Sequence, residues 1–289
     1  MPTRSRAESN HRSRASAPAP LPDRQLLYTA AVQHVDLDLD LLTRIYRGAR
    51  RRPPARLRED FCGTAALACA WVGRGAGRHA WGVDLHAPTL AWARRRRLPH
   101  LGAAAARLAL IHGDARAVSR RRVDVITALN FSYWVFKTRR GLRNYLLAAR
   151  RSLRAGGMLF LDAFGGTDAQ QALLERSRIP ASRGPGGERI PPFTFEWEQA
   201  SFNPVDHHLR CHIHFRLRDG RVMRRAFSYD WRMWTLPELR ELIAEAGFRG
   251  SRVYLQNWDD ASGRALTTYS PRARFENQSG WLVYVVGLA

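Results

Sequence analysis

The stretch LREDFCGTAALACAW, residues 57–71, decides the fold. It continues a short predicted strand, Arg56–Asp60, into a predicted turn at Phe61–Thr64. The alanine-rich segment Ala65–Val72 then predicts a helix. A strand that passes through a tight turn into a helix is typical of the first unit of an α/β protein with a parallel sheet.

The same order of strand, loop and helix continues along the chain. Further strands are predicted at His79–Asp84, Ala109–His112, Val123–Leu129 and Met158–Phe164. One helix begins at Pro88, where a missing N–H does no harm. Another covers Gly141–Arg154 and ends at the glycine pair 156–157. This alternation predicts a doubly wound, mostly parallel sheet with helices on both faces.

The alternation stops between Gly165 and Trp234. Three successive strands are predicted there, at Phe193–Phe202, Leu209–Leu217 and Val222–Trp231. Asp219 and Gly220 form a hairpin turn between the last two, so the segment predicts an inserted antiparallel sheet. The core then resumes with a helix at Leu236–Ala246 and strands at Arg252–Gln256 and Trp281–Leu288.

Four domains follow from this order. Residues 1–24 form a disordered tail rich in Arg, Ser and Pro, and residues 25–166 hold N-terminal cap helices and a ligand-binding core. Residues 167–234 form the inserted lid, and residues 235–289 complete the core sheet.

The composition is that of a globular protein with an unusual charge. The chain has 289 residues, 45% of them hydrophobic, and a formal net charge of +22. Dense positive charge favours nucleic acid as a partner. Lys137 is, however, the only lysine, which indicates a codon bias toward arginine rather than selection for phosphate binding. Nucleic acid is therefore the less favoured partner.

The cysteines and the hydropathy pattern indicate a cytoplasmic protein. Cys62, Cys69 and Cys211 form no closely spaced pair, which favours a reduced compartment over a disulfide framework. No apolar run approaches the roughly 20 residues that cross a bilayer, so no membrane contact is expected.

Acidic and small residues follow the predicted strands, at the edge where parallel sheets bind ligands. Gly63 lets a ligand approach the backbone closely. Asp84 can accept hydrogen bonds from two ribose hydroxyls, and Asp114 from an adenine amino group. The loop lacks the G-x-x-x-x-G-K-[ST] pattern of a triphosphate site.

Taken in order, five segments resemble the motif series of class I S-adenosylmethionine (SAM)-dependent methyltransferases over roughly residues 55–166. They are LREDFCGTAALACAW, GVDL (82–85), IHGDARA (111–117), DVITALNFSYW (124–134) and AGGMLFLDAFGG (155–166). LPELRELIAEAGF, residues 236–248, is similar to the late helix of that family. The resemblance implies a Rossmann-like sheet of seven strands with an inserted antiparallel lid, SAM as cofactor and methyl transfer as activity.

The resemblance also implies roles for single residues. Glu59 matches the acidic position of the first motif and Gly63 its central glycine. Phe61 and Ala65 stand where the family usually has glycines. Asn130 matches the position that faces the reacting methyl group. The predicted cofactor-binding residues are Tyr28, Glu59, Asp60, Cys62, Gly63, Thr64, Asp84, Leu85, Asp114, Ala115, Asn130 and Phe131.

Two of these predictions have a structural alternative. Tyr28, with Gln33, belongs to the segment LLYTAAVQHVD, which either covers the cofactor or packs as an ordinary helix. Cys62 is expected to be a small buried residue in the turn rather than a nucleophile.

Methyl transfer from a sulfonium is an in-line displacement that depends on positioning, so no catalytic triad is expected. The candidate catalytic residues are Asn130, Tyr133 and Asp230. The candidate substrate-binding residues are Tyr133, Trp197, Tyr229, Trp231 and Arg232. His212 and His214 alternate on one strand without a third ligand, so no metal is expected.

ALNFSYW, residues 128–134, differs from the Asn-Pro-Pro-Tyr signature of enzymes that methylate amino groups of bases. With a separate lid, this favours a small-molecule acceptor whose nucleophile is nitrogen or oxygen. Two alternatives stay open at this point. One is an RNA or protein methyltransferase that uses the arginine-rich surface, and the other is a non-catalytic binding or partner protein with the same fold.

Overall fold

The structure is a computed structural model that describes residues 20–117, 121–259 and 264–289. Most of the tail predicted over residues 1–24 lies outside the described residues. No helix in the described ranges is long and apolar enough to cross a membrane.

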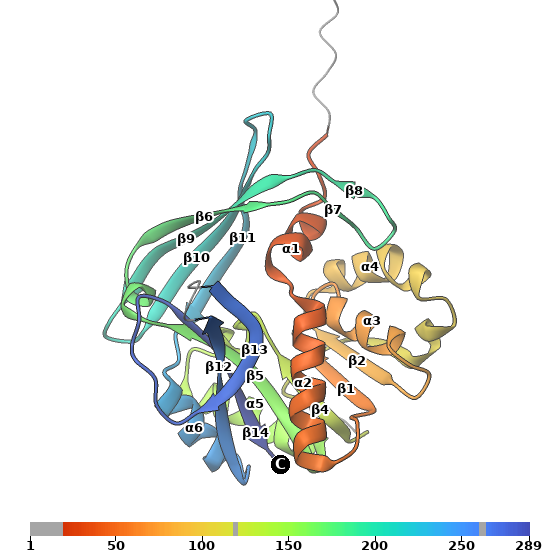
Figure 1. The fold of residues 1–289 in the computed structure, drawn as a ribbon, viewed down its shortest axis with the longest axis vertical. Helices are drawn as coiled ribbons and strands as arrows, with labels where there is room; N and C mark the ends of the chain where they lie inside the picture. Colours follow the sequence, from red (N-terminus) through yellow and green to blue (C-terminus); the bar gives the residue numbers. More distant parts are fainter. Residues whose placement is uncertain (1–19, 118–120, 260–263) are drawn as a thin grey trace, which may run out of the picture.

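The core is an eight-stranded sheet with the order β13-β12-β14-β5-β4-β1-β2-β3 (Figure 1). Its strands are β1 (Arg56–Asp60), β2 (His79–Asp84), β3 (Leu108–His112), β4 (Val123–Ala128), β5 (Leu153–Gly165), β12 (Gly250–Asp259), β13 (Arg264–Arg272) and β14 (Trp281–Leu288). Strands β1 to β5 pair in parallel, and β14 pairs antiparallel with β5. The predicted doubly wound sheet is confirmed, but its predicted count of seven strands is wrong. The additional strand, β13, pairs antiparallel with β12 at the edge.

Helices cover both faces of this sheet. They are α1 (Arg24–Val32), α2 (Val35–Arg50), α3 (Ala66–Gly73), α4 (Ala87–Arg96), α5 (Arg139–Ser152) and α6 (Leu236–Glu245), with 3-10 turns η1 (Leu98–Arg107), η2 (Ser132–Val135) and η3 (Thr167–Gln170). Along β5, Leu159 and Leu161 belong to the core cluster under α5 and α6. Met158 and Phe160 belong to the opposite cluster, under α2 and α3. Side chains alternate between faces, so a strand buried on both sides is apolar throughout.

A second, antiparallel sheet has the order β11-β10-β9-β6. Its strands are β6 (Leu173–Ile179), β9 (Phe193–Asn203), β10 (His208–Arg216) and β11 (Val222–Arg232). The sequence predicted the last three and missed β6. That strand has half-buried apolar residues only at its two ends, Leu173 and Ile179, and lies at the sheet edge.

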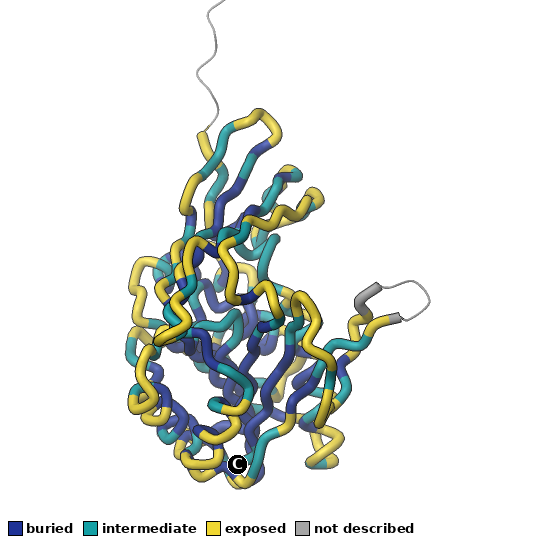
Figure 2. Tube along the Cα trace, turned by 90° about the vertical axis from the view of Figure 1, so that its left-hand side faces the viewer, coloured by how far each residue is buried: buried dark blue, intermediate teal, exposed yellow. Residues whose placement is uncertain are grey.

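The first helix joins the two sheets. Leu26 and Leu27 of α1 share a buried cluster with Trp92 of α4 and with Ile213 and Phe215 of β10. Figure 1 shows the short hairpin of β7 (Ser182–Arg183) and β8 (Arg189–Ile190) arching over α1 toward α4. The burial map in Figure 2 shows dark, buried segments running through the core sheet up to the base of this upper sheet. The antiparallel sheet and α1 therefore form one cover, called the lid below.

Candidate active site

The turn after β1 has an unusual backbone. Phe61, Gly63 and Ala65 all have left-handed φ angles, of 56°, 52° and 55°. In L-residues this conformation costs roughly 1–2 kcal/mol each, whereas glycine adopts it freely. The Phe61 ring packs against Tyr145, with centroids 5.6 Å apart, and Ala65 is fully buried. Packing thus holds two non-glycine residues in the conformation that the family pattern assigns to glycines.

Asp84, at the end of β2, fixes the same turn. Its Oδ2 accepts a hydrogen bond from the backbone N–H of Gly63 at 2.7 Å, and its Oδ1 accepts one from the backbone N–H of His86 at 2.7 Å. A carboxylate has about four acceptor positions. Each oxygen of Asp84 therefore keeps the capacity to accept a further hydrogen bond.

Two acids at the end of β1 have different surroundings. Glu59 Oε2 accepts a hydrogen bond from the backbone N–H of Ala68 at 2.8 Å, and burial raises the pKa of Glu59 to about 8. Asp60 lies 2.7 Å from Arg58 Nε and accepts a hydrogen bond from the Tyr145 hydroxyl at 3.0 Å. The charge of Asp60 is thus compensated by protein groups, whereas no basic side chain among the described residues pairs with Glu59.

These residues line a cavity of about 620 Å³ between the lid and the ends of the core strands. It is called the cofactor cavity below. Twelve residues singled out in the sequence analysis line it: Tyr28, Gln33, Glu59, Asp60, Phe61, Cys62, Gly63, Thr64, Asp84, Asn130, Tyr229 and Trp231. The side-chain oxygens of Gln33 and Thr64 are buried there without a hydrogen-bond partner among the described residues. Burial raises the pKa of the Cys62 thiol, which makes it a poor nucleophile.

Asn130 and Phe131 form the turn after β4. Both have a left-handed φ of 56°. Their backbone N–H groups donate to the two carboxylate oxygens of Asp162 on β5, at 2.7 and 2.9 Å. Burial raises the pKa of Asp162 to about 7, against the effect of these hydrogen bonds. The sequence analysis missed Asp162, which shapes the turn from the neighbouring strand.

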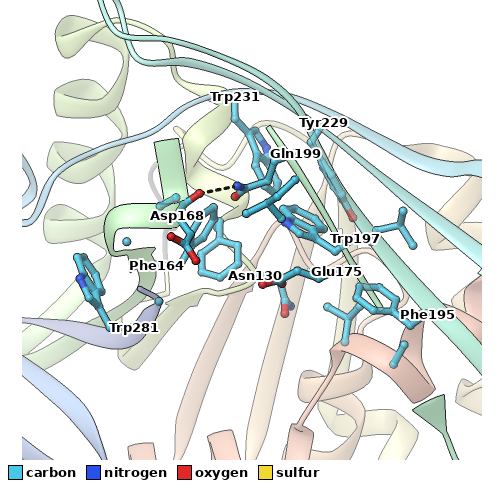
Figure 3. A pocket seen from close by; sticks show the side chains of 18 of the residues that line it. Asn130, Phe164, Asp168, Glu175, Phe195, Trp197, Gln199, Tyr229, Trp231 and Trp281 are labelled. Atoms are coloured by element: carbon cyan, nitrogen blue, oxygen red, sulfur yellow. Dashed lines mark hydrogen bonds between the residues drawn. The ribbon is translucent and has the colours of Figure 1, made fainter. Parts of the chain in front are cut away.

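A second cavity, of about 440 Å³, lies beneath the lid and is called the acceptor cavity below (Figure 3). Its aromatic residues are Tyr28, Phe131, Phe164, Phe195, Trp197, Tyr229, Trp231 and Trp281. Its polar side chains are those of Asn130, Asp168, Glu175, Gln199 and Ser279. Tyr28, Asn130, Tyr229 and Trp231 line both cavities, so the two cavities meet at these four residues.

Comparison with known proteins finds a similar domain family in the first part of the chain. Residues 60–161 match the family described as "Methyltransferase domain". This segment runs from the end of β1 into β5 and includes the turns that line the cofactor cavity. No curated protein matches the sequence.

Three solved structures share the fold of this chain. SAM-bound CalS10, an amino pentose methyltransferase from Micromonospora echinaspora, has 18% identity and a TM-score of 0.62, covering 94% of this chain and 99% of its own. DesVI from Streptomyces venezuelae has 17% identity and a TM-score of 0.63, covering 91% and 95%. The sugar N-methyltransferase KedS8 from Streptoalloteichus sp. has 17% identity and a TM-score of 0.59, covering 98% of each chain.

Aromatic side chains of the lid line the acceptor cavity. Tyr229 stacks on Trp231, with ring centroids 4.2 Å apart and planes at 24°. The ring centroid of Trp197 lies 6.1 Å from that of Tyr229 and 6.2 Å from that of Trp231. All three were predicted to bind substrate, and all three line the acceptor cavity.

Three other predicted residues reach neither cavity. The short helix η2 turns Tyr133 into the core, where it is fully buried and donates its hydroxyl proton to the carbonyl of Asp162 at 2.8 Å. Asp230 and Arg232 alternate with Tyr229 and Trp231 along β11 and therefore lie on the outer face of the lid.

The partners of those two residues confirm the outer placement. Asp230 pairs with Lys137 and His208. Arg232 pairs with Glu238 at 2.9 Å. Tyr133, Asp230 and Arg232 thus line neither cavity, and their assignment to the site stays a prediction.

Four residues that were predicted to bind the cofactor do not line the cofactor cavity. Leu85 is 65% exposed, and its carbonyl contacts the His112 ring at 3.0 Å. Asp114 pairs with Arg116, which lowers the pKa of its carboxyl. Ala115 is buried, and Phe131 lines the acceptor cavity instead. Of the acids predicted to bind the cofactor, Asp84 and Glu59 thus line the cofactor cavity with acceptor capacity.

The lid histidines face outward as well. His214 pairs with Glu198 at 2.8 Å, and His212 contacts the Ser228 hydroxyl at 2.8 Å. No group of three or more metal-ligating side chains occurs in the part of the chain that the structure describes.

Proposed function

We propose that this chain is a SAM-dependent methyltransferase that binds SAM in the cofactor cavity and methylates a nitrogen or oxygen of a small molecule held in the acceptor cavity. The observation that carries the proposal is the junction of the two cavities at Tyr28, Asn130, Tyr229 and Trp231. A methyl group at that junction is accessible from the acceptor side, as an in-line displacement requires.

The residues of the cofactor cavity fit SAM chemically. Asp84 has acceptor capacity for two ribose hydroxyls. Glu59 offers a carboxyl oxygen to an ammonium group, whose positive charge would favour the ionised form of Glu59. The unpartnered oxygens of Gln33 and Thr64 offer two more acceptors. The volume of about 620 Å³ is in the range of ordinary small-ligand sites.

The protein contributes to the reaction by positioning the acceptor and by excluding water. Bound SAM supplies a methyl carbon on a sulfonium, which is electrophilic without further activation. Asn130 sits where its side-chain amide can orient the attacking atom, because its backbone is held by Asp162. Trp231 is only 3% exposed and, with Tyr229, screens the junction from water.

A small molecule fits the acceptor cavity better than a macromolecule. The cavity holds about 440 Å³ beneath four lid strands, and an aromatic lining is typical of small-ligand pockets. The described neighbours give the first compounds to test, because CalS10 is described as an amino pentose methyltransferase and KedS8 as a sugar N-methyltransferase.

The test combines calorimetry with mass spectrometry on the full chain. We expect SAM and S-adenosylhomocysteine to bind wild type, and Asp84→Ala to lose this binding. We also expect SAM-dependent methylation of at least one member of a panel of amino and hydroxy sugars and aromatic amines and alcohols. A folded wild type that binds neither cofactor form would overturn the proposal. Methylation of RNA but of no small molecule would overturn the choice of acceptor.

A further inference from the structure

The acceptor cavity has the opposite charge from the rest of the protein. The chain carries a formal net charge of +22. None of the described residues that line the acceptor cavity is Arg, Lys or His, whereas two are acids, Asp168 and Glu175. The cofactor cavity, by contrast, is lined by Arg24 and Arg225 as well as by acids. An acidic pocket in a strongly basic protein selects for a cation.

Strand alternation explains how Glu175 faces inward without a partner. On β6, Glu175 is in register with Trp197 of β9, and both line the acceptor cavity. The next residue, Arg176, points to the outer face and pairs with Glu196 at 3.1 Å. The basic side chain beside Glu175 in sequence is thus on the other side of the sheet.

The other acids of the lid strands are neutralised. Glu196 pairs with Arg176 and Arg216, Glu198 pairs with His214, and Asp230 pairs with Lys137 and His208. Among the described residues, Glu175 has no such ion pair. The charge of Glu175 therefore stays available to a ligand.

Asp168 is held at the same cavity by its backbone. Its carbonyl accepts a hydrogen bond from Gln199 Nε2 at 3.0 Å, drawn in Figure 3, and its N–H donates to the carbonyl of Ser279 at 3.0 Å. These contacts connect the backbone of Asp168 to the lid and to the segment before β14, so its backbone is held relative to both.

Aromatic faces complete a cation site. Figure 3 shows Phe164 and Trp197 among the labelled acids and Asn130. Rings of this kind attract ammonium groups through their negative faces, and tryptophan does so best. A carboxylate-bearing acceptor would be repelled, and a neutral alcohol would offer no positive charge to either acid.

We propose, on the basis of the function above, that the acceptor is an aliphatic amine and that Glu175 and Asp168 are the residues that select its charge. The amine enters as an ammonium ion and transfers one proton to Glu175 and on to solvent. Its freed lone pair forms the new N–C bond, while the electron pair of the broken C–S bond stays on the cofactor sulfur. Asn130 Oδ1 accepts a remaining N–H and orients the lone pair toward the methyl group.

The test uses matched amine and hydroxyl probes on the full chain saturated with S-adenosylhomocysteine. The pairs are D-glucosamine with D-glucose and tyramine with tyrosol. Isothermal titration calorimetry gives each dissociation constant for wild type, Glu175→Gln, Asp168→Asn and the double variant. Glu241→Gln on α6 removes the same charge away from both cavities and serves as the matched control.

We expect at least one amine to bind wild type about tenfold or more tightly than its hydroxyl partner, as charge-assisted hydrogen bonds predict. Glu175→Gln should remove most of this preference, and Glu241→Gln should keep it. Raising NaCl from about 50 to about 500 mM should weaken binding of the amine and leave that of the hydroxyl compound unchanged.

Equal affinity within both pairs, or a preference that survives the double variant, would overturn the inference. So would a protein that binds S-adenosylhomocysteine but no amine at about 10 mM. These outcomes leave the proposed function intact. A wild type that fails to bind S-adenosylhomocysteine would overturn both proposals. Binding of S-adenosylhomocysteine therefore distinguishes failure of the proposed function from failure of the amine inference alone.

Discussion

The carboxylate of Asp84 accepts a hydrogen bond from the backbone N–H of Gly63 at 2.7 Å. This contact links the end of β2 to the turn after β1, across the floor of the cofactor cavity. The same side chain therefore has two tasks. It holds a strained turn in shape, and it offers its remaining acceptor capacity to a ligand.

Asp84→Asn tests whether these hydrogen bonds of Asp84 support cofactor binding. An amide has one acceptor oxygen, so one of the two N–H groups bound to Asp84 loses its partner, at a cost of roughly 1–3 kcal/mol. We expect SAM binding, measured by calorimetry, to weaken about tenfold or more. Asp219→Asn, at the β10–β11 hairpin, is the control and should leave SAM binding unchanged. Equal affinity of Asp84→Asn and wild type would refute this role.

Glu59 predicts how stability depends on pH. A glutamate that ionises near pH 4.5 in the unfolded chain has a pKa of about 8 here, because burial disfavours its charged form. Its contribution to stability is complete below about pH 4.5 and is lost as pH rises through about 8. Glu59→Gln keeps an acceptor for the N–H of Ala68 and removes the titration. The free energy of unfolding of wild type should therefore fall relative to Glu59→Gln between about pH 5 and 8, by about 1.4 kcal/mol per pKa unit.

Urea titrations of both proteins at four pH values in that interval measure this difference. A constant difference between wild type and Glu59→Gln would show that Glu59 is ionised in the fold throughout. A difference that grows in favour of wild type would contradict the burial argument directly.

Because Ala65 has a left-handed backbone, we expect its replacement by glycine to cost little stability. Ala65→Gly relieves roughly 1–2 kcal/mol of backbone strain. It also loses a buried methyl group and gains unfolded-state entropy, which together cost a similar amount. We expect a change in the free energy of unfolding of less than about 1 kcal/mol. Ala68→Gly, in the first turn of α3, lacks the relief and should cost about 1–2 kcal/mol. Urea denaturation that gave equal losses for both variants would count against the strain at Ala65.

Sequence patterns predicted most of the core because its strands and helices have strong signals. The five segments that resemble the family motifs fall on or just after β1, β2, β3, β4 and β5. The lid was predicted less completely. Its edge strand β6 carries Glu175 and two arginines between apolar ends, and β13 contains Pro271, which strands tolerate at an edge. Neither strand has the apolar alternation that a sequence window detects.

Sequence patterns point to residues of the cofactor cavity where one strand end decides the position, and they miss residues where two elements meet. Asp84 ends β2 and Glu59 lies within β1, and both line that cavity. Tyr229 and Trp231 alternate with Asp230 along β11, which separates the two rings that line the acceptor cavity from the outer carboxylate. Asp162 carried no signal of its own, because its role depends on the register of β5 against β4.

Asp162→Asn should impair methyl transfer more than cofactor binding. The carboxylate of Asp162 accepts from the N–H groups of both Asn130 and Phe131, and an amide oxygen replaces only one of these acceptors fully. We expect the turn after β4 to loosen and kcat to fall about 10- to 100-fold, because misplacement of an orienting group by about 1 Å has effects of that size. The dissociation constant of SAM should change by less than about threefold.

The measurement pairs steady-state methyl transfer, followed as S-adenosylhomocysteine release with an accepted substrate, with calorimetry of SAM binding. Val285→Ala on β14 is the control, because it removes two buried methyl groups without contacting the turn and so lowers stability alone. If Val285→Ala lowered kcat as much as Asp162→Asn, the loss would be due to general destabilisation. If Asp162→Asn kept wild-type kcat, the hydrogen bonds to Asn130 and Phe131 would have no part in positioning the acceptor.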